Sequence, residues 1–439
     1  MSFLSILLFI VGFYGFYNNA KYLTLLALSI LSTSWFGFAE PILSLGPIQL
    51  QNGDLALLLI FVLLPFRNKN QNSKIDGIKN ALFLFFLFFT VSVAYDYIFR
   101  GTSPMQIFRT TRHIGYLAFF FLINSFNWKD YKLFFKYLVI ITVIHAVLYI
   151  SQYLFGLNFS SQEIELNDLG GARYRNDPPY LIPAFVFLIF LIEENRLYKW
   201  YLVFFILAII MTQSRGAIIS AITAIFLFLF FKKNLKIHTL IFISLITIVI
   251  FNITLNYLPI INERFTDSYT QYSSFADLDF DNLESFYYQG SFIFRIGLTF
   301  ERFMYVLADP ITTLIGVGYI PDMDITSPIF ILGTESPILP TGYEQYNSID
   351  IFFPNIITRY GIVGSIIFIY FIFQLFVFSF KHRQNLFGKI LLTYLISLLL
   401  ISFINNTFYN GQFYLIIFIL IGQTNLNHKL QTNVSIQNK

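Results

Sequence analysis

Ten of the thirteen arginines in this chain stand in connectors that contain no lysine at all. An arginine side chain presents a planar fork of donors that grips phosphate or carboxylate through two parallel hydrogen bonds, and it keeps its charge when partly buried. Arginines without lysines therefore indicate binding of an anionic group such as a phosphate. The alternative is that each one pairs with a nearby carboxylate or extends to a membrane surface. The ten are Arg100, Arg109, Arg112, Arg173, Arg175, Arg215, Arg264, Arg295, Arg302 and Arg359.

Arg215 has the strongest case for a functional role. It lies in Thr212-Gln213-Ser214-Arg215-Gly216, which leaves almost no polar connector between two apolar runs. A charge held at the edge of hydrocarbon is costly and is functional by default. The small neighbours Ser214 and Gly216 would let another backbone or a ligand approach closely.

A second cluster of arginines lies in the turn at residues 170–179, which contains Arg173 and Arg175. Glycines and prolines fix this turn directly before an apolar run. Residues at i and i+2 on extended backbone point the same way, so the two arginines could bind one group together. The alternative is a plain interfacial turn.

A third cluster contains Arg295, Glu301 and Arg302. Apolar residues at helical spacing, among them Phe294, Leu298 and either Met304 or Tyr305, predict an amphipathic helix that lies on a membrane face. A salt bridge from Glu301 to Arg302 or Arg295 is the simpler alternative to a functional role for these charges.

The rest of the chain must hold these residues at one face of a membrane. With 56% hydrophobic and 12% charged residues, it differs from soluble domains, in which about 25% of residues are charged. We predict an all-α integral membrane protein, a polytopic helical bundle of about 11–14 transmembrane helices with one large extracytoplasmic loop. The apolar runs cover residues 3–17, 21–37, 54–66, 80–99, 113–124, 133–155, 179–193, 198–212, 216–231, 238–258, 355–380, 387–404 and 411–425.

The lysines predict the orientation of the bundle. All fifteen lysines lie in one alternating set of connectors and in the tail, which places that set on the cytoplasmic side. The lysine-free connectors then face outward, and so does the N-terminus. The first apolar run has no basic leader and no small-residue cleavage site, so it is predicted to be a retained span.

This pattern divides the chain into four parts. Residues 1–258 form transmembrane helices 1–10 with short loops, and residues 259–350 form the large outward loop, whose length implies a function. Residues 351–426 form the C-terminal transmembrane helices. Residues 427–439 form a cytoplasmic tail, and the polar chain after Gln423 is predicted to be a loose end.

Two classes of chemistry are excluded by what the sequence lacks. Without cysteine there is no disulfide, thiol nucleophile or thiolate metal site. No Gly-x-x-x-x-Gly-Lys-Ser/Thr motif is present, which argues against a nucleotide enzyme. No metal, cofactor or nucleic acid is expected.

Several motifs follow one another in a recognisable order. Thr212 to Gly216 reads Thr-x-Ser-Arg-Gly, and Arg295 is followed by Asp309-Pro310 and then Gly316-Val317-Gly318. Tyr346-Asn347-Ser348-Ile349 precedes Tyr360-Gly361-Ile362-Val363-Gly364. Arg173 or Arg175 with Asn176-Asp177-Pro178 is a looser match. From about Gly170 to Ile367 the chain thus resembles the O-antigen polymerase and O-antigen ligase superfamily of bacterial surface-polysaccharide assembly.

One departure from that superfamily helps to separate its two activities. Many ligases have a histidine before the asparagine at the position that Tyr346 occupies here. Among the five histidines, only His113 is expected near the outer face. The missing histidine favours a polymerase over a ligase.

The resemblance implies a membrane glycosyltransferase that takes a glycan from undecaprenyl diphosphate and transfers it to the non-reducing-end sugar of another lipid-linked repeat unit. Arg215 and Arg295 would bind the leaving diphosphate without a metal, and Arg173, Arg175 and Arg302 would assist. A carboxylate would serve as the general base, with Glu301, Asp309, Glu344 and Asp350 as candidates. Tyr343, Tyr346 and Asn347 would contact the sugars.

The resemblance also implies the location and the partners. The protein would span the bacterial inner membrane several times with its large loop in the periplasm, and a chain-length regulator protein is a possible partner. The alternatives are an O-antigen ligase, which transfers the glycan to lipid A-core, and a polysaccharide flippase. Flippases carry ionisable residues deep in the bundle, whereas the charges here gather at the ends of the apolar runs.

Overall fold

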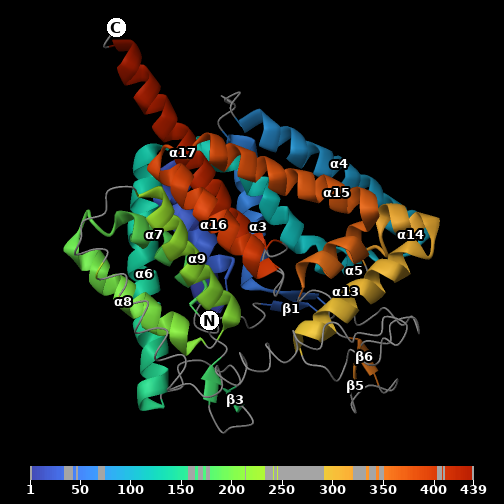
Figure 1. Ribbon diagram of the computed structural model, residues 1–439. Helices are drawn as coiled ribbons and strands as arrows, with labels where there is room; N and C mark the ends of the chain where they lie inside the picture. Colours follow the sequence, from blue (N-terminus) through green and yellow to red (C-terminus); the bar gives the residue numbers. More distant parts are fainter. Residues whose placement is uncertain are drawn as a thin grey trace.

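The computed structural model describes residues 2–33, 43–45, 48–67, 75–156, 164–166, 172–174, 178–212, 214–232, 241, 245, 291–319, 333–335, 343–345, 351–402, 408 and 411–437. These residues form a helical bundle with three small hairpins (Figure 1). The helices before the large loop are α1 (Ser2–Tyr17), α2 (Lys21–Leu31), α3 (Asn52–Leu63), η2 (Leu64–Phe66), α4 (Asp76–Phe99), α5 (Pro104–Thr111), η4 (Arg112–Ser125), α6 (Trp128–Phe155), α7 (Leu181–Leu191), α8 (Arg196–Met211) and α9 (Arg215–Phe231). In the loop and after it come α13 (Ser291–Leu307), α14 (Pro310–Ile315), α15 (Phe352–Lys381), α16 (Leu386–Ser402) and α17 (Gly411–Gln437).

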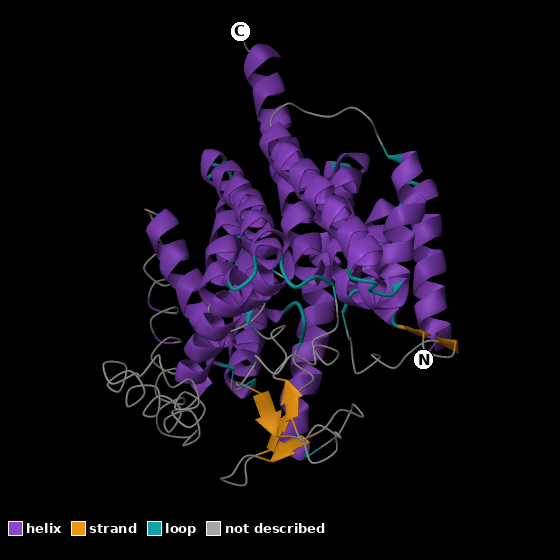
Figure 2. Cartoon of the chain, turned by 90° about the vertical axis from the view of Figure 1, so that its right-hand side faces the viewer, coloured by secondary structure: helices purple, strands orange, loops and turns teal. Residues whose placement is uncertain are grey.

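The strands pair only within short antiparallel hairpins. β1 (Leu43–Leu45) pairs with β2 (Ile48–Leu50), β3 (Ile164–Leu166) with β4 (Ala172–Tyr174), and β5 (Gly333–Glu335) with β6 (Tyr343–Gln345). In Figure 2 these strands lie at the end of the bundle opposite the C-terminus. These strands are short additions to an all-α protein, and the described strands form no larger sheet.

The apolar runs of the sequence coincide with helices wherever the structure describes them. Among the described residues, α4, α6 and α15 are long and apolar enough to cross a membrane, and seven shorter apolar helices accompany them. This arrangement confirms the prediction of an all-α membrane protein. The run at 238–258 falls almost wholly outside the described residues, so the number of spans stays a prediction.

The C-terminal tail differs from the prediction of a loose end after Gln423. Helix α17 continues without interruption to Gln437, and it projects beyond the other helices (Figure 1). Neither glycine nor proline occurs between Gln423 and Gln437 to end the helix.

Aromatic packing joins α4 to α15 along their length. The Phe85 ring lies 5.0 Å from that of Phe368 and 5.5 Å from that of Tyr360, measured between ring centroids. Phe89 of α4 lies 5.3 Å from Tyr319, which follows α14. Such pairs stabilise a core beyond the area that they bury. The two helices thus pack together beside Tyr319, in the segment that follows α14.

The helix predicted in the large loop is present as α13, and its placement on a membrane face stays a prediction. Ile293, Phe294 and Leu298 are buried, and Met304 is exposed together with its neighbour Phe303. Both α13 and α14 pack against α15. The loop therefore contributes two helices to the same end of the bundle at which α4 meets α15 (Figure 1).

Candidate functional site

Helix α15 is broken at Gly361, where the backbone has φ 62° and ψ −166°. Residues with a side chain rarely adopt this conformation, and glycine does so readily. The residues that follow α14, Gly316 to Tyr319, lie against the break and are called the glycine loop here. The backbone N–H of Val317 donates to the carbonyl of Thr358 at 2.7 Å. The glycine loop thus provides a donor for the Thr358 carbonyl, next to the break in the helix.

Arg359 lies directly before the break, and its side chain is fully buried. Its Nη1 donates to the carbonyl of Gly318 at 3.2 Å. Burying a cation is costly unless it finds acceptors, so the site depends on the position of the loop.

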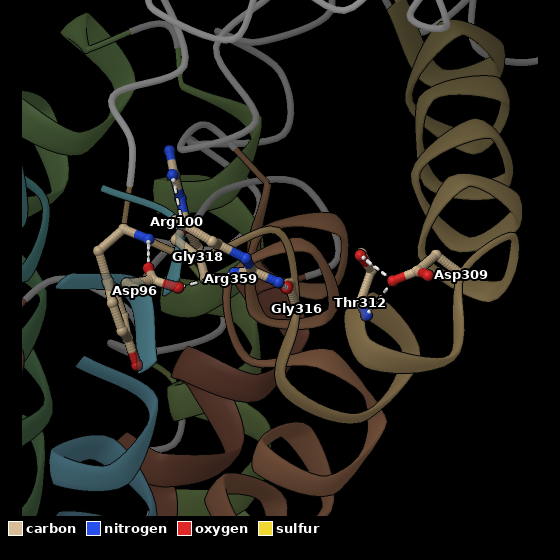
Figure 3. Close-up of polar contacts among 8 residues, drawn as sticks. Asp96, Arg100, Asp309, Thr312, Gly316, Gly318 and Arg359 are labelled. Atoms are coloured by element: carbon tan, nitrogen blue, oxygen red, sulfur yellow. Dashed lines mark hydrogen bonds and ion pairs between the residues drawn. The ribbon is translucent and has the colours of Figure 1, made fainter. Parts of the chain in front are cut away.

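Two residues at the end of α4 hold the glycine loop from the other side (Figure 3). The carboxylate of Asp96 accepts the backbone N–H of Tyr319 at 2.6 Å and Nη1 of Arg100 at 2.7 Å. The Nη2 of Arg100 donates to the carbonyl of Gly316, also at 2.7 Å. The Arg100 guanidinium also lies 5.3 Å from the centroid of the Tyr95 ring. One carboxylate and one guanidinium therefore fix both ends of the loop.

Glu301 and Arg302 of α13 add a second buried ion pair, with 3.0 Å between Oε2 and Nη1. Burial lowers the pKa of Arg302 to about 10, an effect that Glu301 opposes and the charge of Arg359 reinforces. Arg302 is therefore still charged at neutral pH. The pairing of Glu301 with Arg302, given above as the simpler alternative, is present in the structure.

These groups place an excess of positive charge at one end of the bundle. Arg100, Arg302 and Arg359 contribute three cations, and Asp96 and Glu301 contribute two anions. Cations in a partly dehydrated site bind an anion more strongly than they would in water. The cluster could therefore stabilise a phosphate or diphosphate as negative charge develops on it.

Asp309 is exposed and lies at the N-terminus of α14 (Figure 3). Its carboxylate accepts the backbone N–H of Thr312 at 2.8 Å and the hydroxyl of the same residue at 2.9 Å. Those hydrogen bonds lower the pKa of Asp309. A lowered pKa makes a carboxylate a weaker base, so its observed role is to cap the helix.

The structure describes the backbone at Arg215 and the side chain of Arg295, the two arginines predicted to bind the diphosphate. The short turn before Arg215 is present, since α8 ends at Met211 and α9 begins at Arg215, with Ser214 as its N-cap. Arg295 is half-buried, and its Nε is buried with no hydrogen-bond partner among the described residues. Arg295 stands two helical turns before Arg302 and so shares its face of α13.

The other predicted residues lie in the hairpins or outside the described part. Arg173 is in β4 opposite Glu165, and Tyr343 is in β6 opposite Glu335. Their side chains are not described, and Arg175, Tyr346 and Asn347 lie outside the described residues. Among the residues that the structure describes, no three His, Asp or Glu side chains gather as metal ligands.

Sequence reasoning assigned no role to Asp96, Arg100 or Arg359. The two arginines were among the ten in lysine-free connectors. Asp96 carried a signal of its own, because an acid inside an apolar run is rare and functional by default.

Residues 200–369 match the model of a family described as O-Antigen ligase. No curated protein matches the chain. The matched segment includes α13, α14, the glycine loop and the break in α15, and the resemblance to the O-antigen polymerase and ligase superfamily is confirmed over that part of the chain.

Proposed function

We propose that this protein is a polymerase of bacterial surface polysaccharide that acts at the outer face of the inner membrane. It would transfer a glycan from undecaprenyl diphosphate to the non-reducing-end sugar of another lipid-linked repeat unit. The observation that carries the proposal is the grouping of three arginines around the break in α15. Arg100 and Arg359 hold the glycine loop, and Arg302 lies close enough to Arg359 for the charge of Arg359 to lower its pKa.

Glycosyl transfer from a lipid diphosphate requires groups that stabilise the leaving diphosphate, and the arginines can do this. The acceptor hydroxyl oxygen attacks the anomeric carbon of the donor sugar, and the bond from that carbon to the diphosphate oxygen breaks. The electron pair leaves with the diphosphate, whose new charge the guanidinium groups stabilise. We propose that Arg215 and Arg295 share this task with the cluster, and that no metal is needed.

The proton of the acceptor hydroxyl must pass to a base. Glu301 suits this role better than Asp309, because Glu301 is buried beside Arg302 whereas Asp309 is exposed and caps α14. Arg302 would turn from Glu301 towards the diphosphate when the donor binds. The Glu301 carboxylate would then lose this ion pair and become more basic.

The choice of polymerase over ligase rests on the sequence. Tyr346 occupies the position at which many ligases have a histidine. The distribution of lysines supports a periplasmic position for residues 259–350. Tyr343, Tyr346, Asn347, Arg173 and Arg175 would bind the sugars and the diphosphate from the outward connectors, and a chain-length regulator would be a partner in the membrane.

Deletion of the gene in its host tests the proposal, with the surface polysaccharide separated on a gel. A polymerase predicts that the ladder disappears and that a single repeat unit remains on the lipid anchor. Full ladders stranded on undecaprenyl diphosphate would identify a ligase instead. In a second assay, purified protein given only lipid-linked repeat units should produce a ladder, whereas a ligase or a flippase should not.

A further inference from the structure

Asp96 is a carboxylate that the proposed reaction does not use, although it is fully buried at the end of a membrane-crossing helix. We propose that Asp96 is a positioning residue, whose carboxylate fixes the glycine loop and Arg100 relative to the break in α15. Arg100 would thereby be held ready for the diphosphate of the substrate, and Arg359 would support the loop from its buried side. The role in transfer rests on the proposed function, whereas the role in holding the loop does not.

The two oxygens of Asp96 have different partners. Oδ1 accepts from Arg100, which lies one helical turn further along α4, and Oδ2 accepts from the backbone of Tyr319, which is remote in sequence. Removing either donor would leave a buried carboxylate oxygen unsatisfied. The carboxylate therefore favours the one loop position that satisfies both oxygens.

The loop packs directly on this carboxylate. A Cβ atom on Gly318 would collide with both carboxylate oxygens of Asp96 and would lie 2.6 Å from Nη1 of Arg100. The carbonyls of Gly316 and Gly318 accept from two different arginines, Arg100 and Arg359. The position of the loop therefore sets the positions of both guanidinium groups.

Arg100 keeps donors for a ligand after these contacts are made. Its guanidinium carries five N–H groups, and its hydrogen bonds go to Asp96 and Gly316. Its side chain is 19% exposed, and we expect an anion to approach the remaining donors from that side. A guanidinium held at two points is pre-organised and loses little freedom when it binds phosphate.

Helix α4 lies outside residues 200–369, the segment that matches the family. The matched segment supplies the glycine loop and Arg359 but neither Asp96 nor Arg100. The site is therefore completed by an earlier part of the chain.

The absence of cysteine allows a test with single reporter cysteines in the full-length protein. Val317→Cys, in the partly exposed loop, is labelled with a maleimide in the presence and absence of Asp96→Asn. The Asn side chain keeps an acceptor but loses the charge that holds Arg100. We expect labelling at position 317 to accelerate roughly tenfold or more, as for the loss of a charge-assisted hydrogen bond.

Two controls separate a local effect from general loosening. Ser397→Cys, in the fully buried part of α16, should label equally slowly with and without Asp96→Asn. Glu193→Gln removes another carboxylate that pairs with a cation, Lys232 at 2.6 Å, far along the chain from the loop. It should change neither labelling rate. The proposal is wrong if Asp96→Asn leaves labelling at 317 unchanged, or if it accelerates labelling at 397 to the same extent.

The kinetic consequence is measured with lipid-linked repeat units. Asp96→Asn should lower kcat roughly tenfold or more while KM changes less, because the loop positions groups for the transition state. If Asp96→Asn accelerates labelling at position 317 but leaves kcat unchanged, Asp96 has no positioning role in transfer. If Asp96→Asn accelerates labelling at position 317 but the wild-type protein shows no transferase activity, the proposed function is rejected and the role of Asp96 in holding the loop stands. If Asp96→Asn fails to fold, Arg100→Gln replaces it, with faster labelling at 317 and the same fall in kcat expected.

Discussion

A Cβ atom on Gly361 would lie 2.5 Å from the backbone nitrogen of Gly316. The reverse holds too, since a Cβ on Gly316 would lie 2.5 Å from the carbonyl carbon of Arg359. Real Cβ atoms do not approach backbone so closely, so the broken helix and the glycine loop fit together only because both positions are glycine.

The first prediction concerns Gly361→Ala. The added methyl group meets backbone atoms, and the left-handed φ of 62° is unfavourable for alanine. We expect a loss of at least about 2 kcal/mol in the free energy of unfolding, measured by chemical denaturation in detergent. Gly101→Ala is the control, because Gly101 has φ 66° and no atom within 4 Å of its Cβ position. It should show only the conformational penalty of about 1–2 kcal/mol. Equal losses would show that packing at the break is unimportant.

The second prediction concerns Arg359→Lys. Lysine offers a point charge and not a fork, so it would not both hold Gly318 and stabilise a diphosphate. We expect the rate of glycan transfer to fall roughly tenfold to a hundredfold, while the protein still inserts into the membrane. Arg383→Lys, at a partly exposed position after α15, should leave the rate unchanged. A normal rate in Arg359→Lys would show that the fork is not required there.

The third prediction concerns Arg215→Lys. If Arg215 binds the diphosphate with two hydrogen bonds, the variant should lose most activity although it is made and inserted normally. Polysaccharide chain length on a gel and the amount of protein in membranes are the two measurements. Chains of normal length would contradict bidentate binding at this position.

The fourth prediction separates a helix cap from a general base. Asp309→Asn keeps an acceptor for the N–H of Thr312, so it should retain activity, whereas Glu301→Gln should lose nearly all of it. Loss of activity in Asp309→Asn with normal activity in Glu301→Gln would reverse the assignment.

Asp309 also predicts a dependence of stability on pH. Its folded pKa is below the ordinary value of 3.8, so its contribution to stability is present above that value. The contribution is lost as the pH falls through the lower, folded pKa. A comparison of Tm between wild type and Asp309→Asn from pH 6 to pH 3 should reveal this loss in the wild type alone.

The fifth prediction concerns metal ions. Treatment with EDTA should leave transfer by purified protein intact, because guanidinium groups are proposed to stabilise the leaving diphosphate. Activity that vanishes with EDTA and returns with Mg²⁺ would contradict a mechanism based on arginines alone.

The sequence predicted the helices because a membrane span requires a continuous apolar run, and such runs are visible without any neighbour in view. It also predicted α13, since Phe294 and Leu298 recur at helical spacing. The prediction of a loose end after Gln423 was wrong, because polar composition does not by itself end a helix and no glycine or proline stops this one.

The break in α15 and the partner of Asp96 were beyond a reading of the sequence. A glycine at position 361 is compatible with an unbroken membrane helix, where glycine is common. Asp96 binds Tyr319 across 223 residues of sequence, and no local pattern encodes a contact of that range. Arg359 was noticed as a cation, but its burial follows from the glycine loop and not from its own neighbours.

The contact between α4 and the glycine loop bears on how these proteins can be recombined. A chimaera that receives only residues 200–369 from another protein that matches the same family model would combine a foreign glycine loop with the resident α4. Such a chimaera should work only if the donor loop fits the resident Asp96 and Arg100. Grafting the end of α4 together with the loop transfers both halves of the contact, and α4 thereby becomes part of the smallest segment that must be exchanged to keep the glycine loop with its partners.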